Sequence, residues 1–123
     1  MNLVDSSGWL EYFSDGPNAS SFEKPLASPE NLIVPTLCLY EVFRVVLRQR
    51  GETDALQAAA LISQGNLLDL TSEIALEAAK LSVAHKLPMA DSIILATAQS
   101  CDATIWTQDE DFKEIKGVKF IPK

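Results

Sequence analysis

Residues 87–111 read LPMADSIILATAQSCDATIWTQDED, and this stretch decides the fold because it contains a whole structural unit. Pro88 breaks the helical pattern that precedes it, and a new helical pattern runs over residues 90–100. A strand is predicted at residues 103–107, followed by a helical turn that begins at Asp109. A helix, a strand and a polar turn in succession are typical of a domain in which strands and helices alternate.

The same alternation extends over the rest of the chain. Short apolar runs predict strands, and the longer patterned stretches between them predict helices. The predicted strands are residues 3–4, 32–34, 67–70 and 118–121, and the predicted helices are residues 6–13, 19–24, 36–49, 53–63 and 72–85. Alternating strands and helices are joined by right-handed crossovers. We therefore predict one α/β domain over residues 1–123, with a mostly parallel central sheet flanked by helices on both faces.

The composition is that of an ordinary globular domain. The chain has 123 residues, of which 47% are hydrophobic and 22% are charged. Cys38 and Cys101 lie in apolar stretches, which favours free thiols in a reducing compartment. The first residues lack a basic segment followed by a long apolar core, and no stretch has the length of a membrane span. We therefore expect a cytoplasmic protein that does not associate with membranes.

The charge balance bears on nucleic-acid binding. The net charge is −7, from 10 basic and 17 acidic residues. Phosphate affinity comes largely from lysine and arginine, so this balance argues against a protein that binds nucleic acid over its whole surface. A small basic rim around one site can still hold a nucleic-acid backbone.

Four carboxylates stand at unusual positions: Asp5, Glu41, Asp91 and Asp109. Each lies where an apolar run gives way to a turn, or on an otherwise apolar helix, and such places seldom hold a carboxylate without a partner. The carboxyl ends of parallel strands meet at one edge of a sheet, where open α/β folds collect ligands. Carboxylates gathered there repel one another unless a divalent metal neutralises them. The pattern therefore predicts a metal site.

Each acid also has a simpler interpretation when it is taken alone. Asp5 could cap the helix that follows it, and Asp109 could cap the next turn. Asp91 lies in the first turn of a helix, where the macrodipole favours any carboxylate. Glu41 shares a helical stripe with Arg44, so an ion pair on the exposed face is an equally good explanation. Each simple explanation is possible by itself, but four independent explanations account for the shared pattern less well than a single metal site.

Four stretches of the chain form an ordered set. They are Leu3-Val4-Asp5-Ser6-Ser7, Tyr40-Glu41-Val42, the segment from Leu87 to Ala98, and Thr107-Gln108-Asp109-Glu110-Asp111-Phe112. In this order they resemble the signature motifs of the PIN-domain ribonucleases, and most of all those of the VapC-type toxins of prokaryotic toxin–antitoxin pairs. The resemblance covers nearly the whole chain, and its last two stretches are the more specific. It implies a PIN fold.

The resemblance also implies roles for individual residues. The four acids match the quartet that holds Mg²⁺ or Mn²⁺ in that family. Ser7 matches the small polar residue two places after the first acid, and Thr107 matches the hydroxyl residue two places before the last. Asp111 belongs to the last motif, but its place in the family is more often structural. Ser92 is a mild departure, since alanine or another small residue is commoner after the third acid.

A function follows from the same resemblance. The chain is expected to be a metal-dependent endoribonuclease that cleaves RNA with a metal-activated water and acts as the toxin of a toxin–antitoxin pair. Mg²⁺ is usually held by one or two direct carboxylates and keeps several waters, so four acids suffice for one tightly held ion. No histidine is needed, and the only one, His85, lies near a helix end. Arg44 and Arg48 lie on the stripe of Glu41 and are candidates for binding RNA phosphates.

Two other classes of function remain open. A PIN fold without activity would serve only as a binding partner, although the intact quartet argues against it. A phospho-acceptor receiver module is also a small acidic Mg²⁺-binding α/β domain, but it carries an acidic pair at its first strand and a phosphorylatable aspartate at the end of its third. Here only Asp5 follows the first predicted strand, and Asp69 lies inside the third.

The helix predicted at residues 36–49 carries more apolar residues than one core-facing stripe requires. Another chain is expected to cover part of that surface. By resemblance to VapC-type proteins, the partners are a second copy, which gives a homodimer, and an antitoxin segment that brings a basic side chain to the acidic site. Burial of the helix on both sides within the domain is the alternative.

Overall fold

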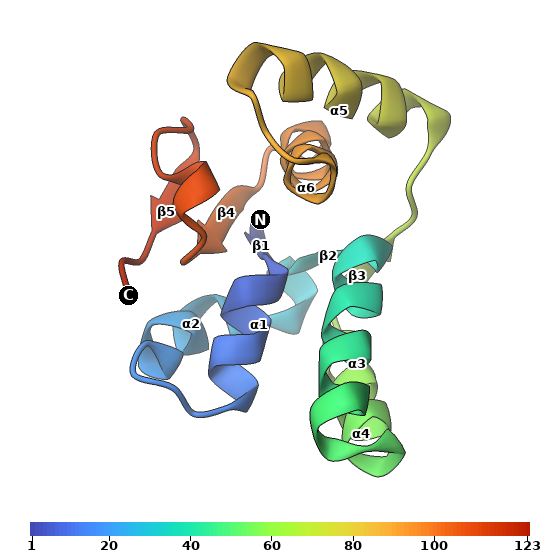
Figure 1. The fold of residues 1–123 in the computed structure, drawn as a ribbon, viewed down its shortest axis with the longest axis vertical. Coiled ribbons are helices and arrows are strands. Elements are labelled where there is room, and N and C mark those ends of the chain that lie inside the picture. Colours follow the sequence, from blue (N-terminus) through green and yellow to red (C-terminus); the bar gives the residue numbers. More distant parts are fainter.

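The computed structural model describes residues 1–123 and contains a parallel sheet of short strands (Figure 1). The strands are β1 (Asn2–Val4), β2 (Ile33–Pro35), β3 (Asn66–Leu68), β4 (Thr104–Thr107) and β5 (Val118–Phe120). Strand β1 pairs with β4 and β4 with β5, while β2 pairs with β3, and every pairing is parallel. A bridge between Asn2 and Leu32 joins the two groups in the order β3-β2-β1-β4-β5. The predicted parallel sheet is confirmed.

The helices connect the strands as the alternation predicts. They are α1 (Ser6–Phe13), α2 (Ala19–Leu26), α3 (Thr36–Arg50), α4 (Glu52–Ile62), α5 (Ser72–His85) and α6 (Met89–Ser100), with 3₁₀ turns η1 (Pro29–Asn31) and η2 (Glu110–Phe112). Helices α3 and α4 run side by side, and α5 lies across α6 (Figure 1). None of the helices is both long enough and apolar enough to cross a membrane.

Local chemistry explains where several helices begin and end. The Asp5 carboxylate accepts a hydrogen bond from the Gly8 backbone at 3.0 Å and caps α1, and the Thr71 hydroxyl caps α5. Gly51 adopts a φ of 95°, a conformation that glycine tolerates, and this lets α4 start directly after α3. Pro88 precedes the first residue of α6, where its missing N–H costs no helical hydrogen bond.

The sheet separates two apolar clusters. Adjacent residues of a strand face opposite sides, so Val4 packs with Trp9 and Phe22 on one side while Leu3 packs with Leu95 on the other. Helices α1 to α4 supply most of the first cluster, and α6 and η2 contribute to the second. Helices therefore cover both faces of the sheet, as predicted.

The third strand differs from the prediction at its end. It was expected to reach residue 70, but β3 ends at Leu68, because its partner β2 ends at Pro35, the residue paired with Leu68. Leu70 lies beyond the strand and is 50% exposed. The residue that follows, Thr71, already caps the next helix. The apolar run is thus longer than the strand.

Neither cysteine forms a disulfide, in agreement with the predicted free thiols. Cys38 on α3 is fully buried, and Cys101 after α6 is partly exposed. Burial raises the pKa of the Cys38 thiol, and the nearby charges of Asp5 and Glu41 raise it as well. The Cys38 side chain therefore remains a protonated, apolar part of the core.

Candidate metal centre

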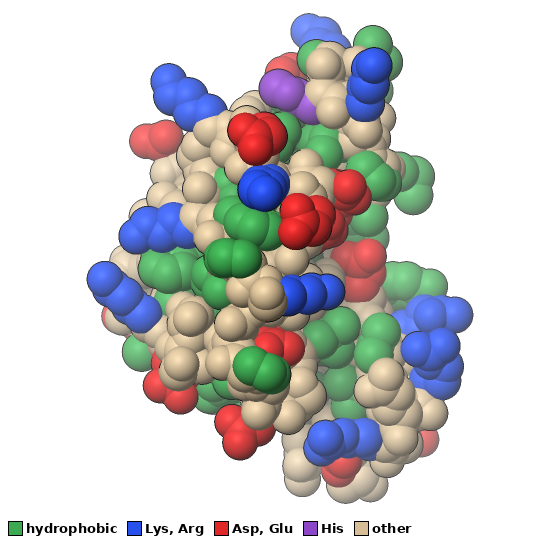
Figure 2. All heavy atoms as spheres, turned by 60° about the vertical axis from the view of Figure 1, so that its left-hand side comes forward, with side chains coloured by type: hydrophobic (Ala, Val, Ile, Leu, Met, Phe, Trp, Pro, Cys, Tyr) green, Lys and Arg blue, Asp and Glu red, His purple; other side chains and the backbone are tan.

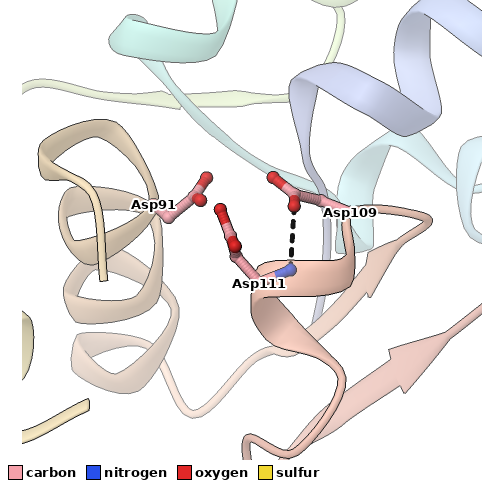
Figure 3. A group of neighbouring side chains, drawn as sticks. All are labelled: Asp91, Asp109 and Asp111. Carbon is pink, nitrogen blue, oxygen red and sulfur yellow. Dashed lines mark hydrogen bonds between the residues drawn. The ribbon is translucent and has the colours of Figure 1, made fainter. Parts of the chain in front are cut away.

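Three carboxylates converge where the sheet meets the start of α6. Asp91 lies in the first turn of α6, Asp109 follows β4, and Asp111 lies in η2. Each can offer an oxygen such that the three lie within 4.8 Å of one another, and Asp91 points from its helix toward the other two (Figure 3). Asp109 Oδ1 also accepts a hydrogen bond of 2.9 Å from the Asp111 backbone, which closes the turn and keeps both aspartates on the same side.

Asp5 lies deeper, with only 2% of its surface exposed. Its carboxylate accepts hydrogen bonds from the Gly8 backbone, from Ser7 Oγ at 2.7 Å and from Thr107 Oγ1. Burial raises the pKa of Asp5, these three donors oppose the rise, and the charge of Asp109 adds to it. Asp5 is therefore both the predicted helix cap and a buried acid beside the three-aspartate cluster.

Ser7 and Thr107 join Asp5 to the segment that carries Asp109. Thr107 Oγ1 donates to Asp5 Oδ2 and accepts a hydrogen bond of 2.9 Å from the Asp109 backbone. Ser7 Oγ donates to Asp5 Oδ1 and accepts one of 3.3 Å from the Gln108 backbone. Both hydroxyls thus bridge the two strand ends, because β1 and β4 are neighbours in the sheet.

Glu41 reaches the site from another direction. It lies on α3, and its Oε1 accepts a hydrogen bond of 2.6 Å from Ser6 Oγ, next to Asp5 in the chain. The alternative of an ion pair with Arg44 is not seen, since the single ion pair in the structure joins Lys80 to Glu77. Glu41 does not belong to the group of three close aspartates. It is held beside Asp5 rather than against Asp91.

Burial and the charges of the cluster both act on Asp91. Its pKa is raised to about 8, first by burial and then by the neighbouring carboxylates Asp109, Asp111 and Asp5. No lysine, arginine or histidine forms an ion pair with any of them. Close carboxylate oxygens that lack a cationic partner are the donor set of a hard divalent cation such as Mg²⁺ or Mn²⁺. The residues present therefore fit a metal of that kind.

Sequence reasoning placed four acids in the site and ranked Asp111 below them. In the structure Asp111 is one of the three closest carboxylates, because the 3₁₀ turn directs it back toward Asp91. Sequence reasoning also missed Ser6 and Gln108, which hold Glu41 and the Asp109 segment. The only signal for Ser6 was a hydroxyl residue directly after Asp5.

The candidate RNA-binding arginines lie outside the carboxylate cluster. Arg44 and Arg48 are exposed on α3, one helical turn apart, and neither forms an ion pair. On the face drawn in Figure 2, a group of acidic side chains lies just above the middle, further acidic side chains are scattered over the lower half, and lysines and arginines are dispersed across the face. The basic groups that could contact phosphate are thus separate side chains around an acidic centre.

Comparison with known proteins identifies the family. A model of the PIN domain matches residues 3–118, so the chain belongs to the PIN domain family. This assignment sets aside the receiver-module alternative. No curated protein sequence matches the chain.

Solved structures agree with the family assignment. A toxin–antitoxin complex from Klebsiella pneumoniae contains a chain that is 27% identical, with a TM-score of 0.82 over 97% of this chain and 96% of that one. VapC20 of Mycobacterium tuberculosis, described as a toxin that cleaves the sarcin-ricin loop, is 20% identical, with a TM-score of 0.79 over 100% and 98%. A DNA-bound VapBC from Salmonella typhimurium is 15% identical, with a TM-score of 0.72 over 99% and 98%. At 20% and 15% identity, the last two structures are similar to this chain in fold alone.

Proposed function

We propose that this PIN-domain protein is a Mg²⁺- or Mn²⁺-dependent endoribonuclease that acts in the cytoplasm as the toxin of a toxin–antitoxin pair. The observation that carries the proposal is the convergence of Asp91, Asp109 and Asp111, with Asp5 fixed beside them and no cation to neutralise the group. The likeness to a toxin–antitoxin complex and to a toxin that cleaves RNA supports it.

The acids would contribute to binding of a divalent ion in two ways, as direct ligands and as supporting acids. Asp91, Asp109 and Asp111 are the residues that would hold the ion directly, since their oxygens are already close. Asp5 and Glu41 complete the acidic centre from positions fixed by hydroxyl donors. The bound ion would supply Lewis-acid polarisation of the scissile phosphate and a water of lowered pKa. Catalysis on this proposal requires the set Asp5, Glu41, Asp91 and Asp109, with Asp111 beside them.

Neutral groups orient the acidic centre, and arginines orient the substrate. Ser7 and Thr107 hold Asp5 through its two oxygens, which keeps the carboxylate from rotating. Arg44 and Arg48 face solvent on α3, the helix that carries Glu41, and are free to pair with RNA phosphates. The RNA backbone would then cross from α3 toward α6.

Apolar side chains on α3 support the proposed protein partners. Tyr40 is 61% exposed and Leu47 is 41% exposed. With Leu39 and Phe43 they line a mostly apolar groove whose lining also includes Arg44. The excess of apolar residues on this helix is therefore partly buried in the domain and partly at the surface. We propose that the uncovered part contacts an antitoxin segment or the second copy of a homodimer.

Cleavage of RNA by the purified protein tests the function. Wild-type protein should cleave RNA with Mg²⁺ or Mn²⁺ and stop when a chelator is added. Asp91→Asn should lose at least about 100-fold in rate, because it removes charge from the centre while keeping the side-chain shape. Asp69→Asn, purified in the same way, is the matched control, since Asp69 is exposed and lies outside the cluster. Undiminished cleavage by Asp91→Asn or in chelator would refute the proposal.

A further inference from the structure

Outside the acidic centre, three polar side chains form a network that ties α1 to the end of β4. Glu11 lies on α1, Asn18 precedes α2, and Gln108 stands between Thr107 and Asp109. Asn18 Nδ2 donates to Gln108 Oε1 at 3.0 Å, and Gln108 Nε2 donates to Glu11 Oε1 at 3.4 Å. The Asn18 backbone donates to the second Glu11 oxygen at 2.7 Å. Each member therefore contacts both of the others.

The surroundings of this network leave it little freedom. Gln108 is only 7% exposed, and a buried amide needs its partners. The Glu11 carboxylate lies against Gly16, where an added Cβ would collide with a carboxylate oxygen. Asn18 Nδ2 also donates to the Pro122 carbonyl at 3.1 Å, which holds the end of the chain to the same point. The network is thus packed in place rather than loosely solvated.

Gln108 is tied to α1 at two levels. Its backbone N–H donates to Ser7, at the start of α1 beside Asp5, and its side chain donates to Glu11, one turn further along the same helix. Two attachments fix the rotation of the strand end as well as its distance from the helix. The neighbouring residue Asp109 takes its orientation from that strand end.

We propose that Gln108 is a positioning residue for the metal centre, held by Glu11 and Asn18, and that it keeps Asp109 in register with Asp5. The inference rests on the proposed function in one respect, because it assumes that the acids bind a divalent ion. Gln108 itself lies outside the set of carboxylates. Loss of an outer partner of this kind typically weakens metal binding without removing a ligand.

Calorimetric titration with Mn²⁺ tests the proposal without using activity as the readout. Gln108→Met keeps a similar volume and removes the amide, and the Mn²⁺ dissociation constant should rise about 10-fold. Asn18→Ala removes one donor nearer the surface and should give a smaller rise, and it serves as the second variant if Gln108→Met fails to fold. Asn66→Ala is the matched control, because it removes hydrogen bonds to the Glu30 and Leu32 carbonyls at the opposite edge of the sheet.

The possible outcomes distinguish the positioning role of Gln108 from the proposed metal dependence. A lowered melting temperature with unchanged Mn²⁺ affinity in Asn66→Ala, beside weakened affinity in Gln108→Met, supports positioning. Wild-type affinity in folded Gln108→Met, or in Asn18→Ala where Gln108→Met does not fold, overturns it while the proposed function stands. An equal loss of affinity in the control also overturns it. A wild-type protein that binds no Mn²⁺ overturns the proposed metal dependence and the positioning role together.

Discussion

Replacing Asp91 with asparagine should stabilise the metal-free protein at pH 8. The pKa of Asp91 is raised from 3.8 to about 8 by burial and by the charges of its neighbours. A full shift of that size would correspond to about 5–6 kcal/mol. Because Asp91 is only half-buried, solvent screens much of the repulsion, and about 1–3 kcal/mol is the reasonable expectation. The melting temperature of Asp91→Asn should then exceed that of the wild type by about 5–10 °C in chelator.

The raised pKa of Asp91 also predicts how the stability of the wild type changes with pH. A carboxyl group whose folded pKa is raised contributes stability that is fully present below its unfolded value and is lost as the pH rises through the folded value. The wild type should therefore lose stability from Asp91 between pH 4 and about 8, whereas the variant should not. Thermal unfolding in chelator at several pH values measures the difference, with Asp69→Asn as control. A variant that is less stable than the wild type at pH 8 would refute the reasoning and indicate a structural role for Asp91.

Three further predictions concern the same centre. Mn²⁺ should bind more tightly as the pH rises from 6 to 8, and binding should release protons, because Asp91 must lose its proton. Calorimetry in buffers of different ionisation enthalpy measures the proton release, and a Mn²⁺ affinity that does not change with pH would contradict the prediction. Thr107→Val should destabilise the protein by about 1–3 kcal/mol and weaken Mn²⁺ binding, since it removes one of the three donors to Asp5 and leaves the Asp109 backbone N–H without its acceptor. Unchanged urea unfolding would argue against the bridge. Arg48→Glu should raise the KM for RNA and lower the salt dependence of RNA binding, with Mn²⁺ affinity unchanged. A KM equal to that of the wild type would show that Arg48 does not contact the substrate.

The placement of Asp5 and Asp109 was predictable because it follows from local rules. Each lies just beyond a short apolar strand, and the carboxyl ends of parallel strands meet at one edge. The structure adds that β1 and β4 are direct neighbours, with Val4 opposite Trp106. This pairing joins residues about a hundred positions apart, and the strand pattern in the sequence contains no information on which strands pair. Only the location at a common edge could be inferred.

The positions of Glu41 and Asp111 depend on tertiary geometry instead. Helical spacing made an ion pair between Glu41 and Arg44 as good an explanation as a metal site, but the packing of α1 against α3 brings Ser6 Oγ within 2.6 Å of the Glu41 carboxylate. A 3₁₀ turn of three residues decides the direction of Asp111, and nothing in its sequence distinguishes an inward aspartate from a solvated one. Sequence patterns report which residues share a face of one element, whereas these contacts arise between elements.

The way Asp5 is stabilised explains how an acidic centre can exist in a protein of net charge −7. A buried carboxylate normally takes a cationic partner, but the donors to Asp5 are a backbone N–H and two hydroxyls, all of them neutral. Neutral donors compensate for lost hydration and leave the negative charge in place. An arginine at the same point would stabilise the fold more strongly and cancel the charge that a metal requires. On the proposed function, this arrangement would preserve affinity for a divalent cation at the expense of metal-free stability. The carboxylate of Asp5 and its hydroxyl partners thus cap α1 and also hold Asp5 in the acidic centre.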